Sequence, residues 1–186
     1  SSDYSYDRII LNFFKRFYFS VFGYFDVELE ANKLWGDIPF PLLNVLRANQ
    51  TYSYQLYSYN LMNFLEFVTD RHVSINAEYH FNGYILNKIP LIKYLKWRSI
   101  LTFKGVYGDL RDVNNPNINP QAMLFPTDIL GNTTTFTLEN KPYIEVSIGV
   151  GNILKFFRVD IVKRLTYLDN PDVAEYGIRA RFKFDF

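Results

Sequence analysis

The sequence ends in the stretch IRARFKFDF (residues 178–186), in which apolar and charged side chains alternate without exception. The apolar residues are Ile178, Ala180, Phe182, Phe184 and Phe186, and the charged residues between them are Arg179, Arg181, Lys183 and Asp185. Successive side chains of a β-strand point to opposite faces, whereas a helix would mix the two sets around its circumference. The stretch therefore predicts a β-strand with one apolar face and one charged face.

The same alternation recurs along the chain and predicts an all-β protein. It is regular in residues 25–32, 73–81 and 157–167, and less regular in residues 8–19, 57–68, 97–107 and 143–150. With residues 178–186 these stretches give about eight strands of roughly 8 to 13 residues, against about 5 or 6 in ordinary soluble sheets. A strand that crosses a membrane needs about 9 to 11 residues, so these lengths are typical of a transmembrane β-barrel.

The connections between the strands are of two kinds. Short polar stretches at residues 20–23, 69–71 and 169–172 predict tight turns between antiparallel strands. Residues 87–96 alternate Ile and Leu with lysines and predict an amphipathic connector, helical or looped, suited to a membrane surface. Residues 108–142 are rich in Asn, Pro and Thr and predict a long loop.

The strand count also predicts on which side of a membrane the connections lie. If the C-terminus is periplasmic, counting back places the loop of residues 108–142 outside the cell and the connector of residues 87–96 in the periplasm. The same count puts residues 36–56 in the periplasm. Because that stretch is long for a periplasmic turn, either part of it folds into the barrel or the strand count is wrong.

Composition excludes several classes of protein. Lys and Arg number 20 and Asp and Glu 19, so the net charge of +1 gives no electrostatic basis for binding nucleic acid. The chain has no cysteine and only two histidines, which argues against disulfides, thiolate chemistry and a three-histidine zinc site, and no cofactor is expected. No run of about 18 uncharged apolar residues exists, which excludes a bundle of membrane-spanning helices.

Two architectures hold many aromatic residues without a long apolar run: a soluble β-barrel and a membrane β-barrel. In the membrane barrel the charged strand faces line the lumen, where acidic and basic side chains on neighbouring strands neutralise one another. The residues expected in this lumen charge network are Glu28, Glu30, Glu78, Glu145, Arg158, Arg164, Arg179 and Arg181. In the soluble barrel the same side chains face water and need no partners.

The aromatic residues favour the membrane architecture. They make up 19% of the chain, and ten Tyr and Trp residues fall near the ends of the expected strands, where membrane barrels carry aromatic girdles. These ten are Tyr18, Tyr24, Trp35, Tyr84, Tyr94, Trp97, Tyr107, Tyr143, Tyr167 and Tyr176. Phe182, Phe184 and Phe186 form a pattern similar to the C-terminal signal by which bacterial outer-membrane barrels are handed to their assembly machinery.

Short motifs spread over nearly the whole chain carry a family resemblance. They are NLMNFLEFVTDR (60–71), YHFNG (79–83), NKIPL (87–91), KWR (96–98), PYIE (142–145), GN (151–152), FRVD (157–160) and RLTY (164–167). In this order they resemble an uncharacterised envelope family of Bacteroidota, whose members carry a carboxypeptidase-regulatory-like domain ahead of an outer-membrane β-barrel. The resemblance implies that this chain is the C-terminal barrel part of a longer protein. Because the regulatory-like domain is a small β-sandwich and not a peptidase, the resemblance implies no enzymatic activity.

A catalytic site finds little support in the sequence. His80, Ser74 and Asn82 supply residue types of a serine hydrolase on the outer face of a barrel, yet Ser74 and His80, six positions apart on one strand, lie roughly 20 Å from each other. His72 falls at an expected turn, where a solvent-exposed polar role is expected. Glu28 and Glu30 lack the oxygen-rich loop of a calcium site and are expected to pair with arginines. The sequence therefore predicts no catalytic, cofactor-binding or metal-binding residues.

Together these features predict an antiparallel transmembrane β-barrel, or the C-terminal part of one, formed as a single domain by residues 1–186. The expected location is the bacterial outer membrane. The expected partners are membrane lipid, the barrel assembly machinery during insertion, and other envelope proteins. The expected function is non-enzymatic, a component that transports or docks something at the envelope; an outer-membrane hydrolase and a soluble ligand-binding β-barrel are the alternatives.

Overall fold

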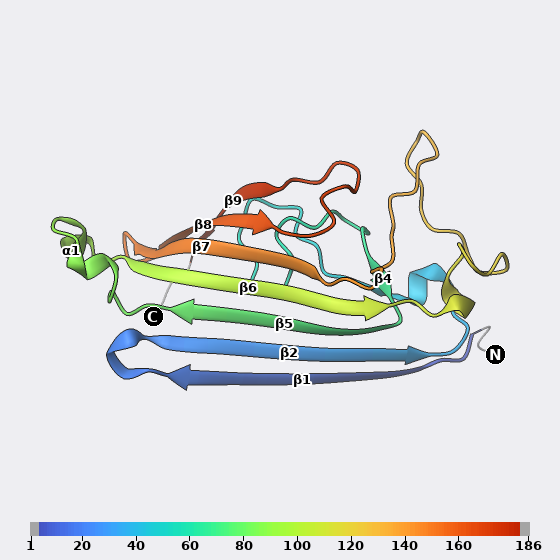
Figure 1. The fold of residues 1–186 in the computed structure, drawn as a ribbon, viewed down its shortest axis with the longest axis horizontal. Coiled ribbons are helices and arrows are strands. Elements are labelled where there is room, and N and C mark those ends of the chain that lie inside the picture. Colours follow the sequence, from blue (N-terminus) through green and yellow to red (C-terminus); the bar gives the residue numbers. More distant parts are fainter. Residues whose placement is uncertain (1–3, 183–186) are drawn as a thin grey trace.

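One antiparallel sheet of seven strands dominates the computed structural model, which describes residues 4–182 (Figure 1). In order across the sheet, its strands are β1 (Asp7–Tyr18), β2 (Tyr24–Trp35), β5 (Arg71–His80), β6 (Arg98–Asp109), β7 (Tyr143–Ile153), β8 (Phe157–Arg164) and β9 (Tyr176–Phe182). The short strands β3 (Asn44–Val45) and β4 (Val68–Thr69) pair with each other outside this sheet. Among the described residues, helical structure is limited to α1 (Ile92–Leu95) and the 3-10 turns Ser20–Phe22, Phe40–Leu42, Leu86–Lys88 and Asp112–Asn114.

The expected antiparallel all-β architecture is confirmed, but the sheet is not closed into a barrel. Within residues 4–182, β1 and β9 are the two ends of the strand order and do not pair with each other. Seven of the eight expected strands are present, the last described only as far as Phe182. The strand expected in residues 57–68 is wrong. Its apolar residues, Leu61, Met62 and Phe67 among them, are buried against the sheet instead of extending it.

The missing strand changes the ends at which connections lie. The connection between β1 and β2, the connector with α1, and the β7–β8 turn lie together on the left of Figure 1, and we call this the turn end. The connections β2–β5, β6–β7 and β8–β9 lie on the right, at the loop end. Residues 36–56 therefore start from the same end as the loop of residues 108–142. The expectation that residues 36–56 lie at the same end as the connector of residues 87–96 is wrong, because it counts a strand in residues 57–68 that the structure does not have.

The register gives the sheet two opposite faces. Ile148, Ile161 and Ile178 lie side by side across β7, β8 and β9 on what we call the outer face, and they are 67%, 58% and 65% exposed. Glu145 and Arg164 lie opposite each other on the inner face and are buried. Apolar side chains are thus exposed and charged side chains buried, the reverse of the usual distribution in soluble proteins.

Residues 36–67, which we call the cover segment, bury the part of the inner face formed by β6, β7 and β8. Tyr59, Met62 and Phe67 of this segment form an apolar cluster with Val106 and Tyr143 of the sheet. The cover segment also caps part of the free edge of β9. There the backbone N–H of residue 54 donates to the carbonyl of residue 180 at 2.8 Å, and the N–H of residue 180 donates to the carbonyl of residue 52 at 3.0 Å. The opposite edge strand, β1, is exposed at all twelve residues.

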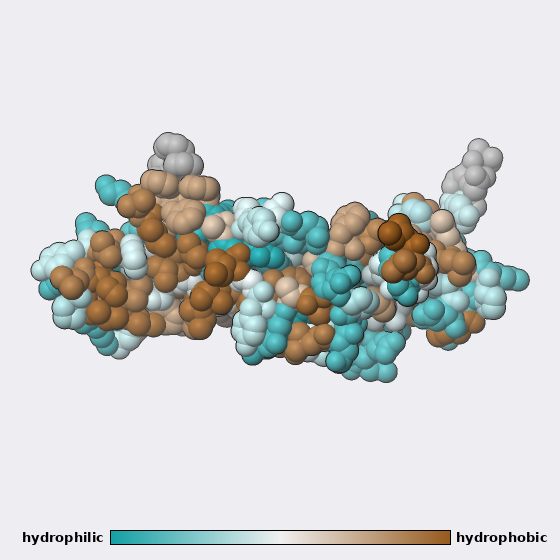
Figure 2. Space-filling model, turned by 90° about the horizontal axis from the view of Figure 1, so that it is seen from above, coloured by the Kyte–Doolittle hydropathy of each residue, from teal (hydrophilic) through white to brown (hydrophobic). Residues whose placement is uncertain are grey.

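Hydrophobic and hydrophilic surfaces are separated along the molecule. Seen from above, hydrophobic residues gather over the turn end on the left, and hydrophilic residues predominate over the middle and much of the loop end (Figure 2). Exposed apolar residues at the turn end include Phe22, Ile85, Leu91, Leu154 and Phe182. Within residues 4–182 no helix is long and apolar enough to span a membrane.

Candidate functional site

The inner face and the cover segment are joined most tightly at Glu145. The alternation of β7 turns this carboxylate inward, beneath the cover segment. It accepts hydrogen bonds from the backbone N–H groups of Asn60 at 2.8 Å and Leu61 at 2.7 Å, and from the hydroxyl of Tyr143 at 2.6 Å. The Glu145 carboxylate thus accepts hydrogen bonds from two backbone N–H groups of the cover segment. These charge-assisted bonds hold the cover segment on the sheet.

A second junction is the ion pair between Arg164 and Glu66. Their side chains are fully buried, with nitrogen–oxygen distances of 2.6 and 2.9 Å. Arg164 also donates to the carbonyl oxygens of Thr166 and Tyr167, and Asn170 donates to Glu66 at 2.8 Å. Every charge of the pair is therefore hydrogen-bonded, the condition under which a buried pair is tolerated.

Lys104 anchors the middle of the cover segment. Its Nζ donates to the carbonyl oxygens of Gln55 at 2.5 Å and Ser58 at 2.7 Å. The ammonium group also lies 5.0 Å from the centre of the Tyr54 ring. A buried cation thus holds a turn of the cover segment against β6.

Arg158 forms the centre of a charged cluster next to this anchor. It bonds to Glu78 at 2.8 Å and to both carboxylate oxygens of Asp160 at 2.7 and 2.8 Å. The ring of Tyr54 lies 4.4 Å from the guanidinium group. Burial raises the pKa of Tyr54 to about 12, so its hydroxyl stays neutral at physiological pH.

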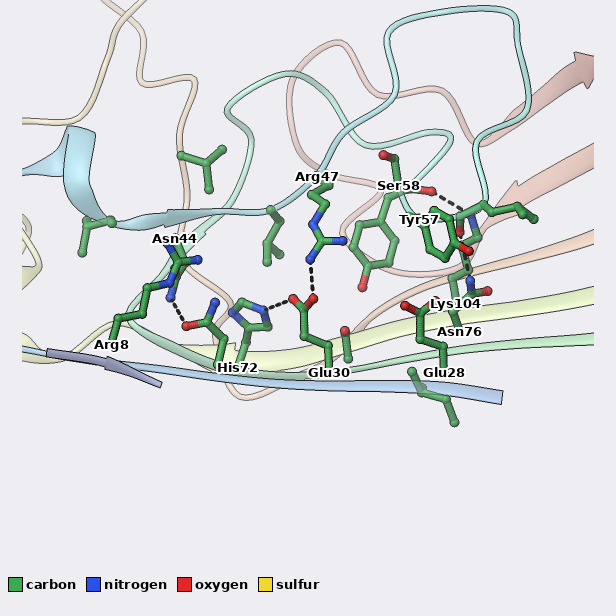
Figure 3. Close-up of a pocket in the computed structure, with 18 residues that line it drawn as sticks. Arg8, Glu28, Glu30, Asn44, Arg47, Tyr57, Ser58, His72, Asn76 and Lys104 are labelled. Carbon is green, nitrogen blue, oxygen red and sulfur yellow. Dashed lines mark hydrogen bonds and ion pairs between the residues drawn. The ribbon is translucent and has the colours of Figure 1, made fainter. Parts of the chain in front are cut away.

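A polar cavity of about 290 Å³ remains between β2, β5 and the cover segment (Figure 3). Glu30 lies in it between Arg47, with which it forms an ion pair, and His72, whose Nε2 is 3.4 Å away. Glu28 points into the same cavity, and no hydrogen bond or ion pair joins it to another described residue. The cavity has the polar lining and the volume to hold water or a small polar ligand.

Neither histidine is placed to activate a serine. His72 binds Thr69 through Nδ1 at 2.9 Å and Glu30 through Nε2. His80 binds Glu78 through Nε2 at 2.5 Å and stacks on Tyr24 with 4.3 Å between ring centres. Both lie on the inner face, so the outer-face serine–histidine pair considered from the sequence is wrong. Residues 4–182 contain no group of three His, Asp or Glu side chains placed to hold a metal ion.

The eight residues expected to neutralise one another have varied partners. As far as the structure describes the chain, only Glu78 and Arg158 form a pair within that set. The others bind residues outside it: Glu30 binds Arg47 and His72, Glu145 binds backbone N–H groups, Arg164 binds Glu66, and Arg179 donates to the carbonyl of Asn60 at 2.8 Å. Glu28 and Arg181 have no hydrogen-bond or ion-pair partner in the described part of the chain.

Sequence reasoning missed the partners supplied by the cover segment. Arg47 and Glu66 lie in stretches without a regular period, so nothing in the local pattern marks them as inner-face partners. Asp160 and Lys104 were detectable, because the alternation of β8 and β6 places both on the charged face. The alternation shows which face a side chain occupies but not which segment folds over it.

Two of the ten aromatic residues expected in a surface girdle are buried instead. Tyr143 and Tyr167 are buried in the core cluster with Phe67, and the other eight are not part of a buried cluster. Of the C-terminal aromatic pattern, Phe182 ends β9 and packs against Phe157, with 5.0 Å between ring centres. Phe184 and Phe186 lie outside the described residues.

The class of protein that these features define is an antiparallel β-sheet protein with an exposed apolar face and a charged face covered by its own chain. The model of one family, the C-terminal domain of a family of unknown function (DUF5686), matches residues 1–112, and the chain belongs to this family. The match includes β1 to β6 and the cover segment. No curated protein and no solved structure matches the chain.

Proposed function

We propose that this chain forms part of the wall of a transmembrane β-barrel in a bacterial outer membrane and acts there as a non-enzymatic envelope component. The observation that carries the proposal is the pairing of an exposed apolar outer face with a buried ionic inner face. Burial of apolar surface is worth about 25 cal/mol per Å², so in water this distribution forgoes stabilisation that lipid contact would supply. In a membrane barrel it is the expected distribution.

The boundaries of the apolar outer face support the proposal. At the loop end the register aligns Lys33 with Arg71 and Arg71 with Asp109, a charged row, and Trp35 follows. At the turn end Tyr84 and Tyr94, in the connection between β5 and β6, are 43% and 74% exposed. Charged and amphipathic aromatic residues thus border an apolar band, as they do where a barrel meets the two membrane interfaces.

The open sheet requires a partner for the edge strand β1. Unpaired backbone N–H and C=O groups are not tolerated in hydrocarbon, so a wall made of this sheet has to be closed by strands outside this chain. We propose that these strands come from a longer protein. This sequence resembles an envelope family of Bacteroidota in which a regulatory-like domain precedes the barrel.

The cover segment favours docking over free passage as the task of the barrel. It is held on the inner face by Glu145, Arg164 and Lys104, so this part of a lumen would be filled by protein. A structural or docking role at the envelope needs no open channel. The hydrolase alternative is disfavoured because His72 and His80 each bind a carboxylate and no serine.

The first test is the migration of the natively extracted protein in a gel containing mild detergent, with and without boiling. A membrane barrel stays compact until boiled, so a heat-dependent shift is expected. Release of the protein into buffer without detergent, with no shift, would contradict the proposal.

Substitutions on the two kinds of exposed surface sharpen this test. An arginine facing lipid near the bilayer midplane costs about 2–4 kcal/mol, so Ile161→Arg is expected to reduce the compact band. Leu154→Arg is the matched control, because Leu154 is 75% exposed but lies in the β7–β8 turn, beyond the outer-face band. If the sheet instead faces water, both variants will behave like the wild type.

A further inference from the structure

A second cavity, of about 550 Å³, opens on the inner face at the turn end. Cations predominate among the charged side chains that line it. The cations are Arg16, Arg98, Lys155, Arg158 and Arg181, and the carboxylates are Asp26, Glu28 and Glu78.

Two of these carboxylates are already occupied by two of the cations. Asp26 accepts both of its hydrogen bonds from Arg16, at 2.6 and 2.7 Å, and Glu78 is bound by Arg158 at 2.8 Å. In the described part of the chain, Arg98 and Arg181 have no carboxylate partner. One terminal nitrogen of Arg98, which lies against Gly83 beyond the end of β5, is buried without a hydrogen-bond partner among the described residues, and this costs free energy.

The remaining carboxylate, Glu28, also lines the cavity, but within the described residues it forms no ion pair with Arg98 or Arg181. The register aligns Glu28 with Asn76, and Asn76 with Lys104. Lys104 is six residues along β6 from Arg98, so the two rows are separated by roughly 20 Å.

On its cavity side Arg98 faces a space in which cations outnumber carboxylates. Its partner across the β6–β7 ladder is Gly151, which has no side chain to fill the cavity. Arg181 lies directly opposite Arg158, and like charges in such positions repel each other. Arg98 and Arg181, which have no carboxylate partner in the described part of the chain, thus border one space in which cations outnumber carboxylates.

We propose that this cavity binds a multivalent oxyanion, bearing phosphate or carboxylate groups, through Arg98 and Arg181, with Lys155 at its rim. Guanidinium groups present paired N–H donors that match the oxygens of both groups. This cavity adjoins the cavity around Glu30, but Arg98, Arg181 and Lys155 line only the second one. It rests on side-chain geometry alone and holds whether or not the outer face contacts lipid.

The test is isothermal titration calorimetry of the full chain in mild detergent at low salt, with pyrophosphate and citrate as probes. Saturable binding is expected for either probe and is expected to weaken as NaCl is raised. Arg98→Gln and Arg181→Gln should each weaken binding about tenfold, the effect of one charge-assisted hydrogen bond. Binding of both probes indicates shared recognition of oxyanions, and binding of one narrows the class to phosphate or carboxylate.

Arg8→Gln is the matched control, because Arg8 lines the other inner-face cavity at the loop end and is exposed. It should leave binding unchanged. Absence of saturable binding for both probes, or equal weakening by Arg8→Gln, would overturn the proposal. Far-UV circular dichroism verifies that the variants fold. If Arg98→Gln does not fold, Arg181→Gln, on the last described strand, provides the test.

Discussion

The hairpins β1–β2 and β7–β8 have the same alternating pattern but opposite surroundings. In β7–β8 the inward charges Glu145, Asp160 and Arg164 are buried beneath the cover segment. In β1–β2 the pair Arg16–Asp26 lies on the same face of the sheet and stays partly exposed, with 40% of the Arg16 side chain accessible. The strand pattern therefore determines where a charge points, and the segment above it determines whether that charge contributes to stability.

The largest expected difference between the hairpins comes from removing one arginine from each. Arg164→Leu leaves Glu66 buried without its partner and should lower the free energy of unfolding by about 3–5 kcal/mol. Arg16→Leu removes an exposed pair and should cost less than about 1 kcal/mol. Denaturant unfolding followed by circular dichroism measures both values. Equal losses would mean that the cover segment does not isolate Arg164 from water.

Glu145 and Glu28 provide a comparison of two inward carboxylates. Glu145→Leu leaves the two N–H groups of Asn60 and Leu61 without an acceptor, which should cost roughly 2–6 kcal/mol at about 1–3 kcal/mol per buried group. Glu28→Leu breaks no interaction seen in the described residues and should be close to neutral. Hydrogen exchange at Asn60 and Leu61 provides the local measurement, and protection that persists in Glu145→Leu would contradict the role of the carboxylate.

Substitution of the two arginines of β9 is expected to show the same kind of difference in stability, but a smaller one. Arg179 donates to the carbonyl of Asn60, so Arg179→Leu should cost about 1–2 kcal/mol. Arg181 has no partner in the described chain, so Arg181→Leu should have almost no effect on the midpoint of unfolding. The pairing of both arginines with carboxylates, expected from the sequence, would instead predict a loss of a few kcal/mol from either substitution. A large loss in Arg181→Leu would restore that expectation.

The smallest effect is expected at alkaline pH. The pKa of Tyr54 is raised from 10.0 to about 12 in the folded state, so its contribution to stability is complete below pH 10 and is lost as pH rises towards 12. Tyr54→Phe should remove this part of the pH dependence, whereas Tyr57→Phe, at an exposed ring, should not. Unfolding midpoints at pH 9 and pH 11 measure the difference, and identical pH dependence in Tyr54→Phe and the wild type would argue against burial of this hydroxyl.

The strands could be predicted from the sequence because their information is local. In residues 73–81 each side chain differs in character from its neighbours, and the pattern alone predicts β5. Residues 57–68 misled the prediction, because Leu61 and Met62 are adjacent apolar residues that pack on different clusters of the inner face. The partners of the buried charges were not predictable in the same way. Glu66 and Arg164 are separated by 98 positions, and no local period carries that contact.

The position of the cover segment in the chain has a consequence for the order of folding. The sheet is a meander in which each strand pairs with the one made before it, so it can grow by local steps. The cover segment lies between β2 and β5, yet its anchors Glu145 and Arg164 belong to β7 and β8. The cover segment can therefore dock only after more than half of the sheet has formed, and until then Phe67 and Glu66 are not buried. Contacts so distant in sequence form slowly, so we expect the closing of this segment to be the late, rate-limiting event of folding.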